Sequence, residues 1–170
     1  MLGKILPALF AAAAWRMQQE SADSGRPWQR RQALLCLGAP ALRQRAQIVL
    51  EANGYATHLA ETAGPAFALF QEQRIGFVLV DPQFDPQGQG EATILRALAA
   101  LPPKHRRRVY LVQVSPAVRT LATQTAFFRS VNLTVNSADM ETLPKVLQRS
   151  LRDFNDLYQP LNQVAGTRPL

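Results

Sequence analysis

The chain has few of the residues on which most enzyme active sites depend. Its 170 residues include one cysteine and two histidines. The single cysteine, Cys36, excludes an intrachain disulfide, and its place in the apolar run 33–37 predicts a small buried side chain in a cytoplasmic protein. His58 and His105 lie far apart without paired ligands, so we expect no metal site and no cofactor. No grouping of serine, cysteine and histidine indicates covalent catalysis.

Glycine-rich phosphate loops and membrane-spanning runs are also missing. The segment 37–40 holds a single glycine, Gly38, and Pro40 removes a backbone donor. The pair Gly88 and Gly90 is more simply a flexible loop. No apolar run approaches the length of about 20 residues that a transmembrane helix needs. These absences exclude the common nucleotide-binding motifs and an integral membrane protein.

Strand and helix signals alternate along the rest of the chain. With 47% hydrophobic and 18% charged residues, the sequence can bury one sizeable core. Periodicity, prolines and turn residues predict each element. The expected strands are 33–37, 55–60, Ile75–Val80, 109–114 and Leu133–Val135, and the expected helices are Pro40–Ala52, 62–73, 91–101, 116–130 with Ser115 as N-cap, and 143–160.

Five strand–helix units with short links predict an α/β fold. Parallel strands need crossover connections, and right-handed crossovers favour a doubly wound five-stranded parallel sheet in the order 2-1-3-4-5, covered by helices on both faces. A flavodoxin-like cofactor site stays an alternative on architecture alone. We expect residues 30–160 to form this domain, preceded by an apolar helix and linker over 1–29 and followed by a tail over 161–170.

Asp81 follows the most apolar segment of the chain, Ile75–Val80. Six residues without a polar member indicate a strand buried on both faces, and parallel strands present ligand-binding residues at their carboxyl ends. Asp81 therefore stands where this architecture places its chemistry.

The stretch 33–159 resembles the receiver (CheY-like) domain of bacterial response regulators. ALLCLGAPALRQRAQIVLEANGY is similar to the first strand, first helix and following link, GFVLVDPQFDPQGQG to the third strand with its phosphoacceptor loop, and LVQVSP to the fourth strand. The resemblance implies that Asp81 is in the phosphoacceptor position and Ser115 in the position of the switch hydroxyl.

Several positions depart from the receiver pattern. The acidic pair that should end the first strand and hold Mg²⁺ falls on Leu37 and Gly38, and the lysine expected at the end of the fifth strand falls on Asn136. Phosphoryl transfer relies on metal and cationic neutralisation, which these residues do not supply. We therefore expect a degenerate receiver, a pseudo-receiver with a vestigial site at Asp81 and Ser115. It would be a regulatory or adaptor module, not an enzyme, and would bind protein partners in a signalling or assembly complex.

Basic residues precede three of the expected strands. The formal charge is +7, and residues that enter parallel strands lie on the edge of the sheet opposite Asp81. This predicts an anion-binding patch, whose simpler alternative is a solvated basic rim. Its members are Arg30, Arg31, Arg74, Lys104, Arg106, Arg107 and Arg108.

An apolar stretch over residues 5–15 lies between Lys4 and Arg16. It has the length of a signal-peptide core, but a short helix that docks on a protein or a membrane surface fits the pattern better. The candidate docking side chains are Ile5, Leu6, Leu9, Phe10 and Trp15. Because the segment leads into the first strand, it would emerge beside the basic patch, as in a cytoplasmic protein held at the inner membrane surface.

Three alternatives remain open at this level. The first is a phosphoaccepting single-domain response regulator of a two-component phosphorelay that uses Asp81. The second is a nucleic-acid binder that uses the basic patch, although no helix-turn-helix follows the domain. The third is a homodimer through the apolar face of the last helix, which includes Leu143, Leu147 and Leu151; the simpler interpretation is that this face packs on its own sheet.

Liposome co-sedimentation tests the membrane hypothesis. We expect binding that grows with the fraction of anionic lipid and is lost when residues 1–20 are deleted, because an apolar segment and a basic surface act together. Binding without dependence on anionic lipid, or undiminished by the deletion, would contradict it.

Overall fold

The computed structural model describes residues 31–72, 75–166 and 169–170. The strands are β1 (Arg31–Cys36), β2 (Tyr55–Leu59), β3 (Ile75–Val80), β4 (Tyr110–Val114) and β5 (Leu133–Val135). The helices are α2 (Pro40–Ala52), α3 (Ala63–Glu72), α4 (Gly90–Ala99), α5 (Pro103–Arg106), α6 (Thr123–Phe128), the 3₁₀ segment η3 (Ser137–Thr142) and α7 (Leu143–Val164).

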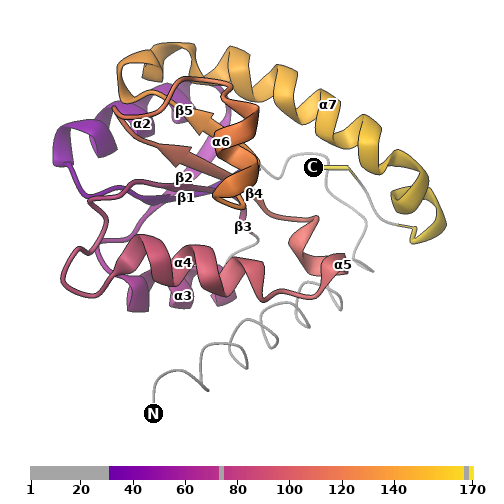
Figure 1. The fold of residues 1–170 in the computed structure, drawn as a ribbon, viewed down its shortest axis with the longest axis horizontal. Coiled ribbons are helices and arrows are strands. Elements are labelled where there is room, and N and C mark those ends of the chain that lie inside the picture. Colours follow the sequence, from indigo (N-terminus) through magenta and orange to yellow (C-terminus); the bar gives the residue numbers. More distant parts are fainter. Residues whose placement is uncertain (1–30, 73–74, 167–168) are drawn as a thin grey trace.

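The five strands form one parallel sheet in the order β2-β1-β3-β4-β5. Figure 1 shows α2 and α7 on one side of this sheet and α3 and α4 on the other. The predicted fold class and strand order are therefore confirmed. Because all strands run in one direction, the loops that follow β1, β3, β4 and β5 meet at one edge, called here the carboxyl edge.

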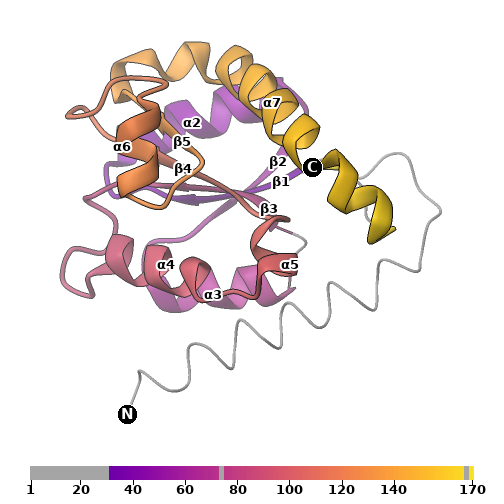
Figure 2. The same ribbon diagram turned by 45° about the vertical axis from the view of Figure 1, so that its right-hand side comes forward.

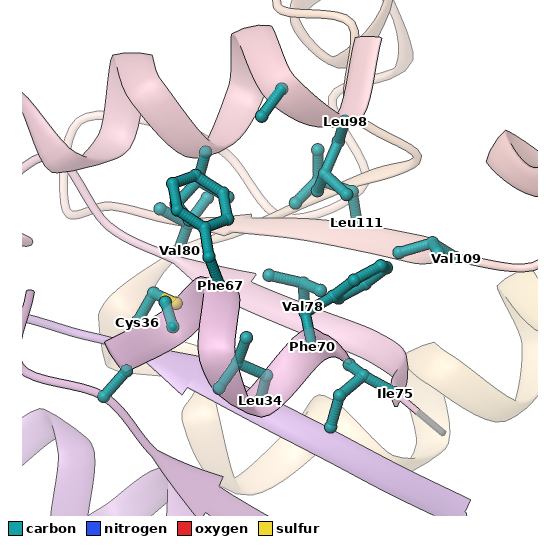
Figure 3. Close-up of a cluster of buried hydrophobic side chains, with 14 of the residues drawn as sticks. Leu34, Cys36, Phe67, Phe70, Ile75, Val78, Val80, Leu98, Val109 and Leu111 are labelled. Atoms are coloured by element: carbon teal, nitrogen blue, oxygen red, sulfur yellow. The ribbon is translucent and has the colours of Figure 1, made fainter. Parts of the chain in front are cut away.

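Each face of the sheet carries its own hydrophobic core. Alternation along β3 sends Phe77 and Leu79 toward α2 and α7, and Val78 and Val80 toward α3 and α4. Figure 3 shows the second cluster, in which Phe67 and Phe70 of α3 lie against the strands. Cys36 belongs to this cluster and is fully buried, as its apolar surroundings in the sequence predicted.

Local signals placed several elements correctly. The observed bounds of α2, β3 and β5 are those predicted from the sequence. Pro40 lies in the first turn of α2, where its missing N–H leaves no bond unmade. Gly54, with φ of +85°, follows the end of this helix in the left-handed conformation that glycine adopts without strain.

The prediction of a helix that begins directly after Ser115 was wrong. The structure has an irregular loop there, and α6 begins only at Thr123. The side chain of Thr134 explains the difference, because its Oγ1 accepts from the N–H of Ala122 at 3.1 Å and donates to the carbonyl of Arg119 at 3.0 Å. Leu121 takes a left-handed φ of +63° within this loop. Tertiary hydrogen bonds to β5 thus replace the helical ones.

The end predicted for the last helix was also wrong, because α7 continues through Pro160 to Val164. Proline removes one N–H from the helical ladder. The carbonyl four residues before Pro160, which loses its N–H donor, lies near an exposed helix end, where water can hydrogen-bond to it. Figure 2 shows α7 running along the sheet and beyond it. A short helix that the sequence reading missed, α5, lies within the basic run before β4.

In the part of the chain that the structure describes, no helix is both long and apolar enough to cross a membrane.

Thr134→Val tests the loop before α6. Valine has the shape of threonine but leaves the N–H of Ala122 and the carbonyl of Arg119 without their buried partner. We expect the free energy of unfolding to fall by about 1–3 kcal/mol in denaturant titrations. Thr123→Val, at an exposed position, is the matched control and should change it by less than about 0.5 kcal/mol. Equal effects in the two variants would contradict this account.

Candidate functional site

Asp81 lies at the carboxyl edge of the central strand, as the sequence predicted. The strand β3 is flanked by β1 and β4, and the N–H of Asp81 donates to the carbonyl of Cys36 at 3.2 Å. The residue is only 3% exposed. Its carboxylate is therefore placed at the junction of the loops that follow β1 and β3.

Two backbone donors hold the Asp81 carboxylate. Its Oδ1 accepts from the N–H of Gly38 at 3.0 Å and from the N–H of Gln83 at 3.1 Å. Burial raises the pKa of Asp81, and the hydrogen bonds from these backbone groups lower it in part. One oxygen thus links the loop after β1 to the loop after β3.

Leu37 and Gly38, which the resemblance places at the positions of the receiver acids, have no side chain that could hold a cation. Leu37 is fully buried in the core beneath α2 and α7. Gly38 packs against the loop after β3 so closely that a Cβ on residue 38 would lie 2.1 Å from the carbonyl oxygen of Gln83. The backbone of Gln83 therefore occupies the space that a side chain at position 38 would need.

Asn136, which the resemblance places at the position of the receiver lysine, binds backbone groups. Its amide Nδ2 donates to the carbonyls of Val118 at 2.8 Å and Pro116 at 3.2 Å. Its Oδ1 accepts from the N–H of Ala138 at 2.9 Å, which caps η3. This side chain organises the loop after β4 and supplies no positive charge.

Ser115 lines the same groove as Asp81. It is 5% exposed, and its Oγ accepts from the N–H of Ala117 at 3.2 Å. The structure therefore brings together the two residues that the sequence predicted for the vestigial site.

Two further acids, Asp85 and Glu61, have structural partners. Asp85 accepts from the N–H of Ala63 at 3.2 Å and from the N–H of Gly88 at 3.1 Å, which joins its loop to the start of α3. Glu61 pairs with Arg43 at 3.2 Å. Among the described residues, no group of three or more histidine, cysteine or acidic side chains could hold a metal ion.

An open groove of about 650 Å³ runs beside Asp81. Its lining is mostly apolar and small, with two arginines on its walls. Arg45 makes a bidentate pair with Glu141, in which Nε lies 3.2 Å from Oε1 and Nη2 lies 2.7 Å from Oε2. Arg129 has a looser contact, 4.0 Å from Glu91.

Sequence reasoning missed three residues of this region. Gln113 is fully buried on β4 and donates through Nε2 to Glu91 Oε1, which also faces Arg129. A polar residue inside the apolar strand 109–114 was the available signal. The partners are 16 or more positions away from Gln113, so only the fold could identify them.

The predicted basic patch is described in part. Arg106 donates to the carbonyl of Val109 at 2.7 Å and to Asn132 Oδ1 at 3.0 Å, so it holds the start of β4. Arg107 lies over the ring of Tyr158, 5.9 Å from its centroid. Arg31 reaches the carbonyl of Leu170 at 3.4 Å. Lys104 and Arg108 also have partners within the structure. The remaining candidates lie outside the described residues: Arg30, Arg74, Ile5, Leu6, Leu9, Phe10 and Trp15.

No protein-family model matches this chain, and no curated protein matches its sequence with significance. Solved structures do share its architecture. Chemotaxis protein CheY4 of Vibrio cholerae is 18% identical with a TM-score of 0.58, and the match covers 72% of this chain and 100% of that one. A sensor protein from Polaromonas is 20% identical with a TM-score of 0.57, covering 74% and 99%.

The signal receiver domain of an HD domain-containing protein from Pseudomonas fluorescens gives a TM-score of 0.59 at 16% identity, covering 81% of this chain and 98% of that one. At such identities the similarity is one of architecture. The described part of the chain has the fold of CheY-like response regulator receiver domains.

Proposed function

We propose that this chain is a pseudo-receiver, a regulatory module with the receiver fold that acts by binding partners in a signalling or assembly complex and carries out no phosphoryl transfer. The observation that carries the proposal is the contact between Gly38 and Gln83. The backbone of Gln83 fills the space that a metal-ligating side chain at position 38 would need. The N–H groups of Gly38 and Gln83 both donate to the Asp81 carboxylate.

The electrostatics of the site support this proposal. Transfer of a phosphoryl group to a carboxylate needs cations around the oxygens that bear the developing charge. Asn136 supplies an amide committed to two carbonyls, and Leu37 is apolar and buried. Asp81 serves in our proposal as an acceptor that joins two loops.

Exposed aromatic residues support a role in partner binding. Phe127 and Phe128 of α6 are 80% and 75% exposed, and their rings contact each other at 6.0 Å between centroids. Large exposed apolar side chains are the residues around which protein interfaces form. We propose a protein as the main partner of the module.

Attachment to an anionic membrane is a second proposal, and it needs residues 1–29 together with the basic patch.

The structural roles of Arg106 and Arg107 weaken the case for nucleic acid as a partner, since their guanidinium groups already have partners. Phosphorylation of Asp81 is the competing function, favoured by its place beside Ser115 in one groove.

Treatment of the full chain with acetyl phosphate and Mg²⁺ tests the proposal against this competitor. We expect no phosphoryl adduct by intact-mass spectrometry under conditions that label a functional receiver domain in parallel. An adduct that disappears in Asp81→Asn would overturn the proposal and establish the phosphorelay function.

Substitutions at Asp81 test its structural role. Asparagine keeps an oxygen that can accept from Gly38 and Gln83, whereas alanine leaves both N–H groups without an acceptor. We expect Asp81→Ala to lower the free energy of unfolding by about 1–3 kcal/mol in denaturant titrations. Asp81→Asn should be at least as stable as the native chain at pH 7.

The pH dependence of the asparagine variant follows from the raised pKa. The folded state holds the Asp81 proton more tightly than the unfolded state, so this group makes folding less favourable as pH rises through the window from its unfolded to its folded pKa. The advantage of Asp81→Asn should therefore be largest above the folded pKa and shrink as pH falls below it. An advantage that grows with acidity would contradict this account.

A further inference from the structure

We infer that the groove beside Asp81 binds a small organic carboxylate, with the carboxylate group held by Arg129 and Ser115 and the apolar body against the groove wall. This inference deepens the proposed function by naming a ligand class for the same site. It rests on that function in one respect, namely that the groove is not used for phosphoryl transfer.

The size and lining of the groove fit an organic ligand. Its volume of about 650 Å³ is in the range of small-molecule sites, which are mostly apolar with a few polar groups. A site built only for Mg²⁺ and a phosphoryl group would need charged ligands in place of these side chains. The apolar lining consists of Ala39, Ala41, Leu42, Pro82, Val114, Pro116, Ala117 and Ala138.

Arg129 is the better placed of the two arginines to bind an anion. Arg45 already has its bidentate carboxylate in Glu141. Arg129 is 47% exposed in its side chain and approaches Glu91 only to 4.0 Å, beyond hydrogen-bond distance. A guanidinium in this state can form a bidentate pair with a ligand carboxylate.

Release of Arg129 would not leave Glu91 without a partner. Glu91 Oε1 also accepts from Nε2 of the fully buried Gln113. The other amide atom of that residue, Gln113 Oε1, has no hydrogen-bond partner among the described residues. Arg129 can therefore turn to a ligand while the Glu91 carboxylate keeps its hydrogen bond from Gln113.

Ser115 supplies a second donor. Its Oγ accepts from the N–H of Ala117, and in the described part of the chain its proton has no acceptor. Since Ser115 also lines the groove, the hydroxyl can donate to the same carboxylate that Arg129 binds.

The charge of Asp81 favours a carboxylate over a phosphate. An anion in the groove is repelled by this residue, and the repulsion is greater for the more highly charged phosphate. The two N–H groups on Asp81 Oδ1 offset part of that charge. A monoanion with an apolar body also buries that body against the groove wall, which favours its binding.

Titration of the full chain with benzoate and indole-3-acetate, followed by amide chemical shifts in NMR, tests the inference. We expect binding with Kd of about 1 mM or tighter, with the largest shifts at residues of the groove. Benzamide, acetate and inorganic phosphate are the comparison probes and should bind at least about fivefold more weakly. Benzamide lacks the negative charge, acetate lacks the apolar body, and phosphate lacks the apolar body and carries a higher charge.

Variants assign the contacts. Arg129→Gln should weaken benzoate binding at least about tenfold, and Ser115→Ala about threefold, by loss of charged and neutral hydrogen bonds. Arg152→Gln, on the exposed surface of α7, is the matched control and should change Kd less than twofold. Glu91→Gln, which keeps an acceptor for Gln113 but removes the charge facing Arg129, should tighten binding about two- to threefold.

Three outcomes would overturn the inference: no shifts in the groove with either carboxylate, unchanged Kd in a folded Arg129→Gln variant, or phosphate binding as tight as benzoate. Amide spectra of each variant establish that it is folded. The acetyl phosphate reaction is scored separately by mass, so labelling of Asp81 would defeat the proposed function while the carboxylate titration still reports on the groove.

Discussion

The Asp81 carboxylate joins two loops that the chain brings together only at the edge of the sheet. One oxygen accepts from Gly38, two residues after the end of β1, and from Gln83, two residues after Asp81 itself. A buried carboxylate with two N–H donors is satisfied without a metal ion. The position of the groove, the closure of the loops and the loss of space at position 38 all depend on this arrangement.

The other side of the groove depends on β5 in a similar way. Thr134 and Asn136 hold the loop after β4 through hydrogen bonds to Ala122, Arg119 and Val118. Ser115 precedes this loop and Arg129 follows α6, and both residues line the groove that Asp81 borders. Asp81 and Asn136, at positions that the receiver resemblance links to phosphoryl chemistry, hydrogen-bond to backbone groups in this structure. These contacts support the proposal of a binding module.

The fold could be predicted from local patterns because each pattern reflects burial. The six apolar residues of β3 have no stable place except between two layers, and the helix after Pro40 carries its start and stop signals within the sequence. The helix expected after Ser115 failed for the opposite reason. Serine followed by proline favours a helix start, yet the hydrogen bonds of Thr134, 19 positions later, decided the conformation.

The candidate site was likewise predictable from the sequence only in part. The sequence determined that Asp81 follows the most apolar strand and that Ser115 follows the next one. It also determined that Leu37, Gly38 and Asn136 stand where the receiver resemblance expects two acids and a lysine. Only the tertiary structure decided what those residues do. It placed the Gln83 backbone against Gly38, gave Asn136 two carbonyls, and set Arg129 beside Glu91 and Gln113. Residue identity fixes which chemistry a side chain can offer, whereas its partners come from distant parts of the chain and exist only after folding.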